Sequence, residues 1–487
     1  MPQKSLIHNI LFKGLLNIFN ILLPMIIIPY VYRILGPSQI GNIEFANTLL
    51  AYFTMLGMLG IYNYGLREIS ANRNNLSKMQ YIYKNLFTIG LISNTIALVA
   101  FVIFIIYFVS DPAVKAISFI LCGNIISQYL YVEWMNEALE EFSFITIKTI
   151  IIRLISILFM LIFIKESQDS LNYVIILTIT AIINYLASFI YSANKIKLPL
   201  RQLFSGLNLK SFVLPLLIIF LLNNTSVLFT LADKTILGFA TDNENVAYFG
   251  LAQRITEMIR TLLLSVIFAT LPRLSLYLKE NRSLYQSGII KLIQFMLVLA
   301  IPMGIGLCLL SKEVILIFGG EEFLGAVPVM QIFSIRVILM SIEAIFYNQI
   351  IFLHGKEKIL ILFSLICGCI NILLNFIFIH KLTPEISICC TLVSEIIFES
   401  LCFIYIKLKL NLQLELFSKK TLNYLIFSLL FIPIIIALRH LNMTYIPFTL
   451  ISIILCCTTY MALLIFTNDS SLIEMKEFMS KFFNRKK

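Results

Sequence analysis

Charged residues are scarce in this sequence: only 13% of its 487 residues are Asp, Glu, Lys or Arg, whereas soluble domains carry about 25%. Tryptophan occurs once, and none of the nine cysteines belongs to a C-x-x-C pair or to a cluster with histidine. Hydrophobic residues make up 59% of the chain, and the mean hydropathy is +0.93. These features exclude a soluble enzyme, a disordered chain, a collagen-like fibre and a disulfide scaffold. They predict an all-α polytopic membrane protein, because the alternating segments of a membrane β-barrel are missing as well.

Long apolar segments recur from one end of the chain to the other. A helix needs about 20 mostly apolar residues to cross the hydrocarbon core of a bilayer. We expect fourteen such helices, at residues 10–34, 40–64, 82–109, 113–135, 144–165, 170–194, 211–239, 245–271, 286–311, 327–352, 358–379, 384–406, 421–439 and 443–466. The first segment is too long for a cleaved signal, and no small-residue cleavage site follows it.

The basic residues predict the orientation of these helices. Placing the N-terminus in the cytoplasm puts most of the 37 Lys and Arg residues in inside loops, and the bias alternates from loop to loop. Both termini are then cytoplasmic, and the net charge of +11 reflects membrane topology rather than nucleic-acid binding. Basic residues in 195–210 and 485–487 also suit anionic lipid of the inner leaflet. No loop is long enough to form a separate domain.

A weak internal repeat relates the two halves of the chain. The run Ile34-Leu35-Gly36 at the end of the first expected helix resembles Ile236-Leu237-Gly238 at the end of the seventh. Copies six helices apart share one orientation, which predicts two parallel six-helix lobes followed by two further helices. Chance similarity between Leu/Ile-rich segments is the alternative. The expected parts are an N-terminal lobe (1–197), a cytoplasmic linker (198–210), a C-terminal lobe (211–406), and two helices with a basic cytoplasmic tail (407–487).

Ionisable residues inside the expected spans are candidates for a functional site, since each costs about 2.5–3.5 kcal/mol on insertion. The eighth span holds Arg254, Glu257 and Arg260 at intervals of three. The tenth holds Arg336 and Glu343, which are seven apart and so share a face. Three Arg against two Glu leave a positive surplus, and Arg binds phosphate through two parallel hydrogen bonds. A structural pair such as Arg254–Glu257 is the alternative.

A second group of charges lies near the ends of expected spans. Arg33 ends the first span, where it is either a substrate contact or an interface residue that reaches water. Glu44, one turn into the second span, is a partner for Arg33. Asp233 and Lys234 form an ion pair that neutralises both charges in one interpretation. In the other, Lys234 contacts the substrate.

Oxygen-rich side chains suggest a cation site in the last part of the second lobe. Glu395 and Glu399 share a face of the twelfth span, and Asn371 and Asn375 lie on the eleventh. Together they would supply the oxygen ligands that hard cations prefer. Hydrogen-bonded packing between the two helices is the alternative. The sequence predicts no bound metal and no cofactor, and it leaves Na+ and H+ open as coupling ions.

The first 75 residues carry a resemblance to a known family. Their runs Pro29-Tyr30-Val31-Tyr32-Arg33-Ile34-Leu35-Gly36, Ile40-Gly41 and Tyr64-Gly65-Leu66-Arg67-Glu68-Ile69 resemble Wzx-type flippases, which belong to the polysaccharide transporter family of the multidrug/oligosaccharidyl-lipid/polysaccharide (MOP) exporter superfamily. Three later segments of this chain also resemble the family. They are Glu133-Trp134 with Glu137 and Glu140, Phe318-Gly319-Gly320-Glu321-Glu322-Phe323, and Gly355-Lys356 with Asn371 and Asn375.

The resemblance implies a flippase for lipid-linked sugars, a transporter rather than an enzyme. Such a protein moves undecaprenyl-pyrophosphate-linked oligosaccharide repeat units from the inner to the outer leaflet of the bacterial inner membrane by alternating access, for O-antigen or capsule synthesis. Its partners would be that lipid-linked oligosaccharide, membrane lipid, a polysaccharide polymerase and a chain-length regulator. We expect five basic residues to line a hydrated cavity and hold the pyrophosphate: Arg33, Lys234, Arg254, Arg260 and Arg336.

Three other functions remain open from the sequence. A lipid-linked peptidoglycan precursor carries the same pyrophosphate, so a flippase for it would need the same basic cavity. A MATE-like drug or cation exporter would need an acidic cavity, whereas the charge predicted here is net basic. A membrane-embedded polymerase or ligase would need a sizeable outer loop with catalytic residues, and the expected outer loops are short.

Overall fold

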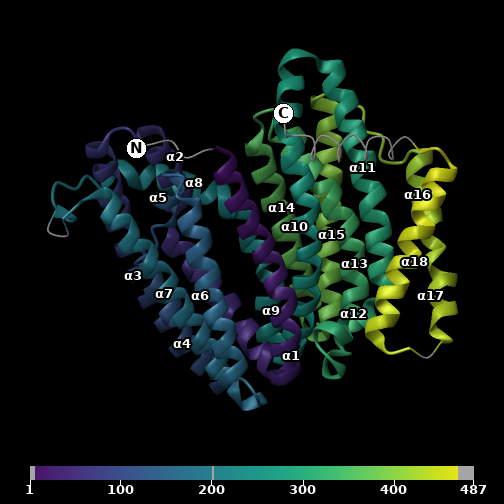
Figure 1. The fold of residues 1–487 in the computed structure, drawn as a ribbon, viewed down its shortest axis with the longest axis horizontal. Coiled ribbons are helices and arrows are strands. Elements are labelled where there is room, and N and C mark those ends of the chain that lie inside the picture. The colour runs from purple at the N-terminus through teal and green to yellow at the C-terminus, as the bar shows by residue number, and fades with distance from the viewer. Residues whose placement is uncertain (1–5, 200–201, 442, 470–487) are drawn as a thin grey trace. The chain divides into compact units, whose positions relative to one another are not determined.

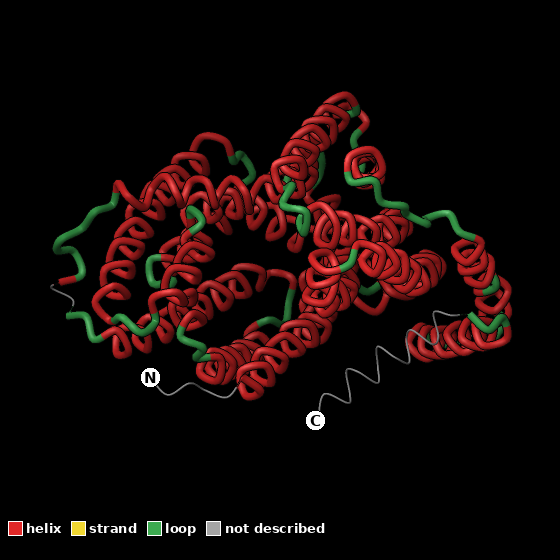
Figure 2. Tube along the Cα trace, turned by 90° about the horizontal axis from the view of Figure 1, so that it is seen from above, coloured by secondary structure: helices red, strands yellow, loops and turns green. Residues whose placement is uncertain are grey.

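The structure is a computed structural model that describes residues 6–199, 202–441 and 443–469. Helices joined by short connections make up these residues, and no strand occurs among them (Figure 1, Figure 2). The all-α prediction is therefore confirmed. The chain divides into two compact units, Met1–Ala247 and Tyr248–Lys487, which are described in turn.

The first unit is built around one long helix, α1, which contacts α3, α4 and α6. A short α5 lies between α4 and α6 in the chain and packs on α2. The helices of this unit are α1 (Leu6–Met58), α2 (Ile61–Asn72), α3 (Leu76–Phe108), α4 (Pro112–Gln128), α5 (Glu133–Ala138), α6 (Phe142–Phe163), the 3-10 turn η1 (Ser167–Asp169), α7 (Ser170–Ile196), α8 (Lys210–Thr230) and α9 (Ala232–Ala240).

The second unit is a bundle in which α11 packs on α13 and α16, and α15 packs on α13 and α14. Its long helices run side by side in Figure 1. Its elements are α10 (Asn243–Glu280, which begins in the first unit), α11 (Arg282–Leu309), α12 (Ser311–Phe318), η3 (Glu321–Phe323), α13 (Ala326–Ala344), the π-helix η4 (Ile345–Ile351), α14 (Glu357–Ile377), η5 (Ile379–Lys381), α15 (Pro384–Lys409), α16 (Lys419–Leu429), α17 (Phe431–Arg439) and α18 (Tyr445–Phe466).

Twelve candidate membrane spans lie among the described residues, so the protein is multi-pass. One of them, Leu11–Asn72, contains both of the first two predicted helices. They are divided at Gly36, whose φ of 72° is strained for residues with a side chain. The seventh predicted helix, 211–239, includes the shorter apolar stretch Lys210–Leu221. The count of fourteen thus stays a prediction, as do the lobe boundaries at 197, 210 and 406.

Capping residues in the sequence mark the N-terminal ends of several of these helices. Asp111 caps α4 by accepting hydrogen bonds from the backbone N–H of Ala113 (2.8 Å) and Val114 (3.3 Å). Pro112 takes the first helical position, where its missing N–H is not needed. Thr383 and Pro384 repeat the same arrangement at the start of α15.

The last helices of the second unit are joined to α11 and α12 by polar contacts. The Tyr460 hydroxyl donates to the Val298 carbonyl (3.1 Å), and Lys420 Nζ donates to Gln294 Oε1 (3.2 Å). At the other end, Arg439 lies 3.5 Å from Glu313. The two helices expected after residue 407 therefore pack on the bundle instead of standing apart from it.

Replacing Gly41 with alanine is expected to disrupt the first unit. A Cβ at this position would lie 1.9 Å from the backbone oxygen of Asn243, and a backbone cannot move away as a flexible side chain can. Asn243 is itself held by hydrogen bonds to Asn42 (2.6 Å) and Asp111 (3.0 Å). We expect a clear loss of thermal stability in detergent. The matched control is Gly306→Ala in α11, where a Cβ meets nothing within 4 Å and stability should be kept.

Candidate functional site

A cluster of charged residues lies inside the second unit, where α10, α13 and α15 meet. Its centre is Arg336, whose Nη2 atom lies 2.7 Å from Glu395 Oε1. Arg336 Nε donates to the same oxygen at 2.7 Å, and the two side chains are 8% and 19% exposed. Glu343, seven residues after Arg336, interacts electrostatically with both of them. A pair held by two hydrogen bonds in a buried setting fixes the relative positions of α13 and α15.

The charges of α10 join this cluster in part. Arg260 Nη1 lies 3.2 Å from Glu257 Oε2, and both side chains are more than a third exposed. Arg260 also interacts with Glu343 and Arg336. Glu257 thus has Arg260 as an ion-pair partner, and Arg254 is exposed on α10. The structure therefore brings Arg260 and Arg336 together from helices far apart in the chain.

Two carboxylates from α15 change the charge of the cluster. Glu395 pairs with Arg336, and Glu399, one turn later, interacts with Glu343 and Glu395. Both glutamates are also members of the cation site expected on the eleventh and twelfth spans. The positive surplus expected from the eighth and tenth spans alone is offset here, because α15 packs against α13 and contributes these carboxylates.

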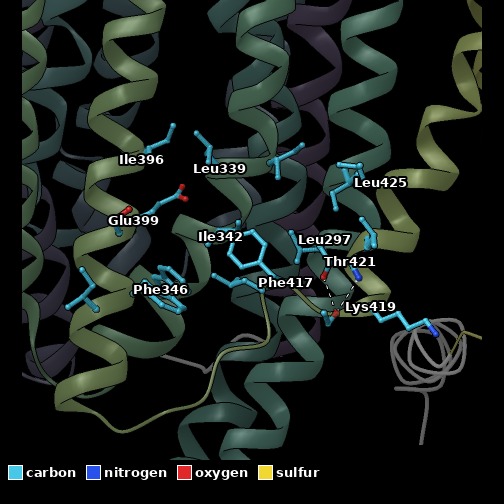
Figure 3. Close-up of a pocket in the computed structure, with 18 residues that line it drawn as sticks. Leu297, Leu339, Ile342, Phe346, Ile396, Glu399, Phe417, Lys419, Thr421 and Leu425 are labelled. Carbon is cyan, nitrogen blue, oxygen red and sulfur yellow. Dashed lines mark hydrogen bonds between the residues drawn. The ribbon is translucent and has the colours of Figure 1, made fainter.

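An apolar groove of about 930 Å³ adjoins the charged cluster (Figure 3). Helices α11, α13, α15 and α16 form its walls, and its volume is within the range of about 300–1,000 Å³ of small-molecule sites. Glu399 points into it from α15, and Lys419 lies at the start of α16. The apolar side chains labelled in Figure 3 are Leu297, Leu339, Ile342, Phe346, Ile396, Phe417 and Leu425. A ligand with an apolar chain and a polar head would find both environments here, since Glu399 belongs to both.

The asparagines of the expected cation site form a ladder between α14 and α15. Asn371 Nδ2 donates to Thr391 Oγ1 (3.0 Å), and Asn375 Nδ2 donates to Asn371 Oδ1 (2.9 Å). Ser387 donates to Asn375 Oδ1 at 2.9 Å. These contacts lie one to three turns before the glutamates along α15, and they match the alternative of hydrogen-bonded packing. Among the described residues, no group of three or more His, Cys, Asp or Glu side chains is placed to hold a metal ion.

The charges near span ends include an ion pair inside the first unit. Lys234 Nζ lies 3.3 Å from Glu44 Oε2, and the Tyr32 hydroxyl donates to Glu44 Oε1 at 3.1 Å. Lys234 therefore joins α9 to α1, whereas Asp233 was the neighbour considered from the sequence. Asp233 is buried, and Arg33 is exposed at the end of the first predicted span.

A buried ion pair in the first unit is missing from the sequence analysis. Lys148 on α6 lies 3.2 Å from Glu133 on α5, and their side chains are 5% and 13% exposed. Ser188 on α7 donates to Glu133 and accepts a 2.5 Å hydrogen bond from Lys148. The signal in the sequence is a lysine inside the expected span 144–165. Its partner lies on another helix, so spacing along the span does not indicate the pair.

Three further glutamates follow Glu133 in and after α5, and their contacts lie on α2, at the end of α2 and on α7. Their contacts are Glu137 with the Tyr62 hydroxyl (3.0 Å), Glu140 with Arg73 (2.8 Å) and Glu141 with Lys195 (2.9 Å). We call Glu133, Glu137, Glu140 and Glu141 the acidic hub. Through these contacts the hub joins α5 and the turn after it to α2, α6 and α7, so this short segment fixes the positions of several longer helices.

Comparisons with known proteins give the chain's relationships. A family model described as "Polysaccharide biosynthesis protein" matches residues 6–278. A protein named "Putative O-antigen transporter" from Escherichia coli (strain K12) is 25% identical over 425 residues, which cover 83% of this chain and 97% of the relative. A protein of the same name from Shigella dysenteriae is 25% identical over 376 residues, which cover 76% and 91%.

Two solved structures share the fold. "Lipid II flippase MurJ, inward closed conformation" aligns with a TM-score of 0.76 at 17% identity, over 94% of this chain and 99% of its own. An inward-facing multidrug resistance MATE family transporter of the MOP superfamily aligns with a TM-score of 0.61 at 12% identity, over 80% and 98%. At identities this low, the structural similarity establishes the shared helical fold. The ligand has to be inferred from the chemistry of the site.

Proposed function

The chain belongs to the polysaccharide biosynthesis protein family, and on that premise we propose that it is a flippase for undecaprenyl-pyrophosphate-linked oligosaccharide repeat units. It moves them from the inner to the outer leaflet of the bacterial cytoplasmic membrane, for O-antigen or capsule synthesis. The relatives' names describe transporters, which confirms a transporter rather than an enzyme as the class of protein. A membrane-embedded polymerase or ligase is thereby disfavoured.

One observation carries the choice of cargo: a charged cluster and an apolar groove lie side by side in the second unit. The proposed cargo has a pyrophosphate and sugars at one end and a prenyl chain at the other. Arg260 is more than a third exposed and Arg254 is exposed, so their guanidinium groups are accessible to phosphate oxygens. The prenyl chain would remain in apolar surroundings along the groove.

A second candidate, export of a lipophilic cation, is favoured by the carboxylates of the same cluster. Four glutamates, Glu257, Glu343, Glu395 and Glu399, surround the two arginines Arg260 and Arg336 in this cluster. A cation would be attracted to these carboxylates, and its apolar part would fit the groove. A lipid-linked peptidoglycan precursor fits the first proposal's chemistry equally, since it also carries a pyrophosphate.

Binding to the purified protein separates these candidates. We expect tight binding of a polyprenyl-pyrophosphate oligosaccharide and much weaker binding of the same sugar without its phosphates. Arg254→Ala and Arg260→Ala should weaken the first interaction, and the matched control Arg67→Ala, at an exposed residue of α2, should not. Tight binding of a lipophilic cation with no response to the pyrophosphate lipid would refute the flippase proposal. Tighter binding of a peptidoglycan precursor than of the oligosaccharide would change the proposed cargo but not the proposed mechanism.

Transport itself is proposed to occur by alternating access, with the site exposed first to the inner and then to the outer leaflet. We propose H+ or Na+ as the coupling ion. Measuring flipping in vesicles while one gradient at a time is collapsed distinguishes them. A polysaccharide polymerase and a chain-length regulator are the proposed protein partners, because they act on the unit once it reaches the outer leaflet.

We propose that both termini are cytoplasmic, which makes a testable statement about the second unit. At the start of α11, Arg282 Nη2 donates to the Leu410 carbonyl (2.9 Å). At its end, Arg439 Nη2 donates to the Leu309 carbonyl (3.4 Å). The loops that carry Glu322 and Gln413 are therefore at opposite ends of this helix. In a variant without native cysteines, a membrane-impermeant reagent should label Glu322→Cys from outside and Gln413→Cys only after the cells are opened. The reverse pattern would show that the orientation is wrong.

A further inference from the structure

A small cavity lies in the first unit, lined by residues of α1 to α5. Its volume is about 20 Å³, and its lining includes Asn94, Gln128 and Trp134. Asn94 Oδ1, Gln128 Oε1 and Trp134 Nε1 are buried and have no hydrogen-bond partner among the described residues. The side chains of Asn94 and Trp134 are 3% and 1% exposed. Leaving such groups buried and unpaired is destabilising, so the site calls for a ligand that pairs with all three.

The surrounding structure holds these polar groups in place. Asn94 Nδ2 donates to the Gly90 carbonyl (2.8 Å), which fixes the carboxamide with its oxygen as the remaining acceptor. The indole of Trp134 lies over Gly65, where a Cβ would come within 2.5 Å of the ring. The Tyr83 ring also packs on the indole, with ring centroids 5.8 Å apart. Asn94 and Trp134 are therefore held in place by their surroundings.

We propose that this cavity binds one water molecule, which accepts a hydrogen bond from the indole N–H of Trp134 and donates one to each of the oxygens of Asn94 and Gln128. One donor and two acceptors on the protein match the two hydrogens and the lone pairs of a water. Buried waters in proteins typically make about three hydrogen bonds, and a space of roughly 10–15 Å³ on this measure suffices for one. The cavity meets both conditions.

The same lining argues against a cation or a larger ligand. The indole nitrogen is a donor only, so its hydrogen would face a bound cation and repel it. Two amide oxygens are also far fewer than the six to eight that a Ca²⁺ ion takes. A sugar or lipid headgroup exceeds the volume of the cavity. Water is thus the one class of ligand that fits both the charge and the size.

The proposed water would join three helices at the segment that carries the acidic hub. Trp134 directly follows Glu133, which pairs with Lys148 on α6. The water adds contacts from α5 to Asn94 on α3 and Gln128 on α4. The inference concerns the internal structure of the first unit and does not depend on the proposed cargo.

Trp134 is the only tryptophan of the chain, so spectroscopy of the full-length protein reports on this site alone. Ultraviolet resonance Raman spectra should show a hydrogen-bonded indole N–H. Brief X-ray radiolysis in H₂¹⁸O should place ¹⁸O on Trp134, because a bound water yields hydroxyl radical beside it. Met296, which is fully buried in α11, is the control and should stay unlabelled. A free indole N–H, or a bonded indole without ¹⁸O labelling, would overturn the proposal.

A variant tests the same site independently. Gln128→Leu removes one acceptor, and we expect loss of the ¹⁸O label on Trp134 together with a weakened indole hydrogen bond. The control Gln331→Leu, at an exposed position of α13, should keep both signals. Unchanged labelling in Gln128→Leu and in Asn94→Leu would contradict the proposal. Should neither variant fold, the spectra of the native protein still decide it.

Discussion

Replacing Arg336 with alanine is expected to abolish export of the surface polysaccharide and to destabilise the second unit. The change leaves Glu395, which is 19% exposed, without its 2.7 Å partner. Removing one member of a buried ion pair typically costs about 3–5 kcal/mol, because the other charge remains buried and unpaired. Export is measured as cell-surface polymer in a strain that lacks the native gene, and stability as the melting temperature in detergent.

A double variant separates the structural role of Arg336 from a role in transport. Arg336→Gln with Glu395→Gln removes both charges and should recover most of the stability, since no unpaired charge is left. Export should remain lost if Arg336 also contributes to cargo binding. Arg336→Lys should recover export only in part, because lysine lacks the two-pronged guanidinium. Normal export by the Arg254→Ala, Arg336→Ala variant would exclude both residues from the site.

The architecture could be predicted because hydropathy is a local property of the chain. Runs of about 20 apolar residues indicate membrane helices whatever they pack against. The break between the first two predicted helices falls at Gly36, where the backbone conformation favours glycine. The predicted count of fourteen spans is not confirmed, since α1 continues on both sides of that break and the segment 211–239 is divided between α8 and α9.

The candidate site could be predicted only as far as spacing within one helix allows. A spacing of seven placed Arg336 and Glu343 on one face of α13, and both belong to the cluster. The partner of Arg336 is Glu395, 59 residues away, and spacing along α13 holds no information about it. The same limit applies to Lys234, whose partner Glu44 lies 190 residues away in the sequence. Pairing between helices depends on packing, which a single sequence does not specify.

Replacing Lys148 with methionine is expected to destabilise the first unit strongly. Lys148 is 5% exposed and contacts Glu133, Ser188 and the Asn184 carbonyl (3.3 Å), so it joins α6 to α5 and α7. Methionine keeps most of the side-chain volume but leaves Glu133 buried without a counter-charge. We expect a loss of about 3–5 kcal/mol, as for other broken buried pairs. Thermal unfolding followed by the fluorescence of Trp134, the residue next to Glu133, measures it.

Two controls show whether the loss comes from the unpaired charge. Adding Glu133→Gln to Lys148→Met should restore much of the stability, because a neutral amide can still accept the hydrogen bond from Ser188. The exposed pair Arg67–Glu68, at 3.0 Å with side chains 63% and 30% exposed, should respond differently. Arg67→Met is expected to cost at most about 1 kcal/mol, since water screens that pair. Equal losses from Lys148→Met and Arg67→Met would mean that burial of the charge does not determine the effect, and that the acidic hub does not hold α5 in place.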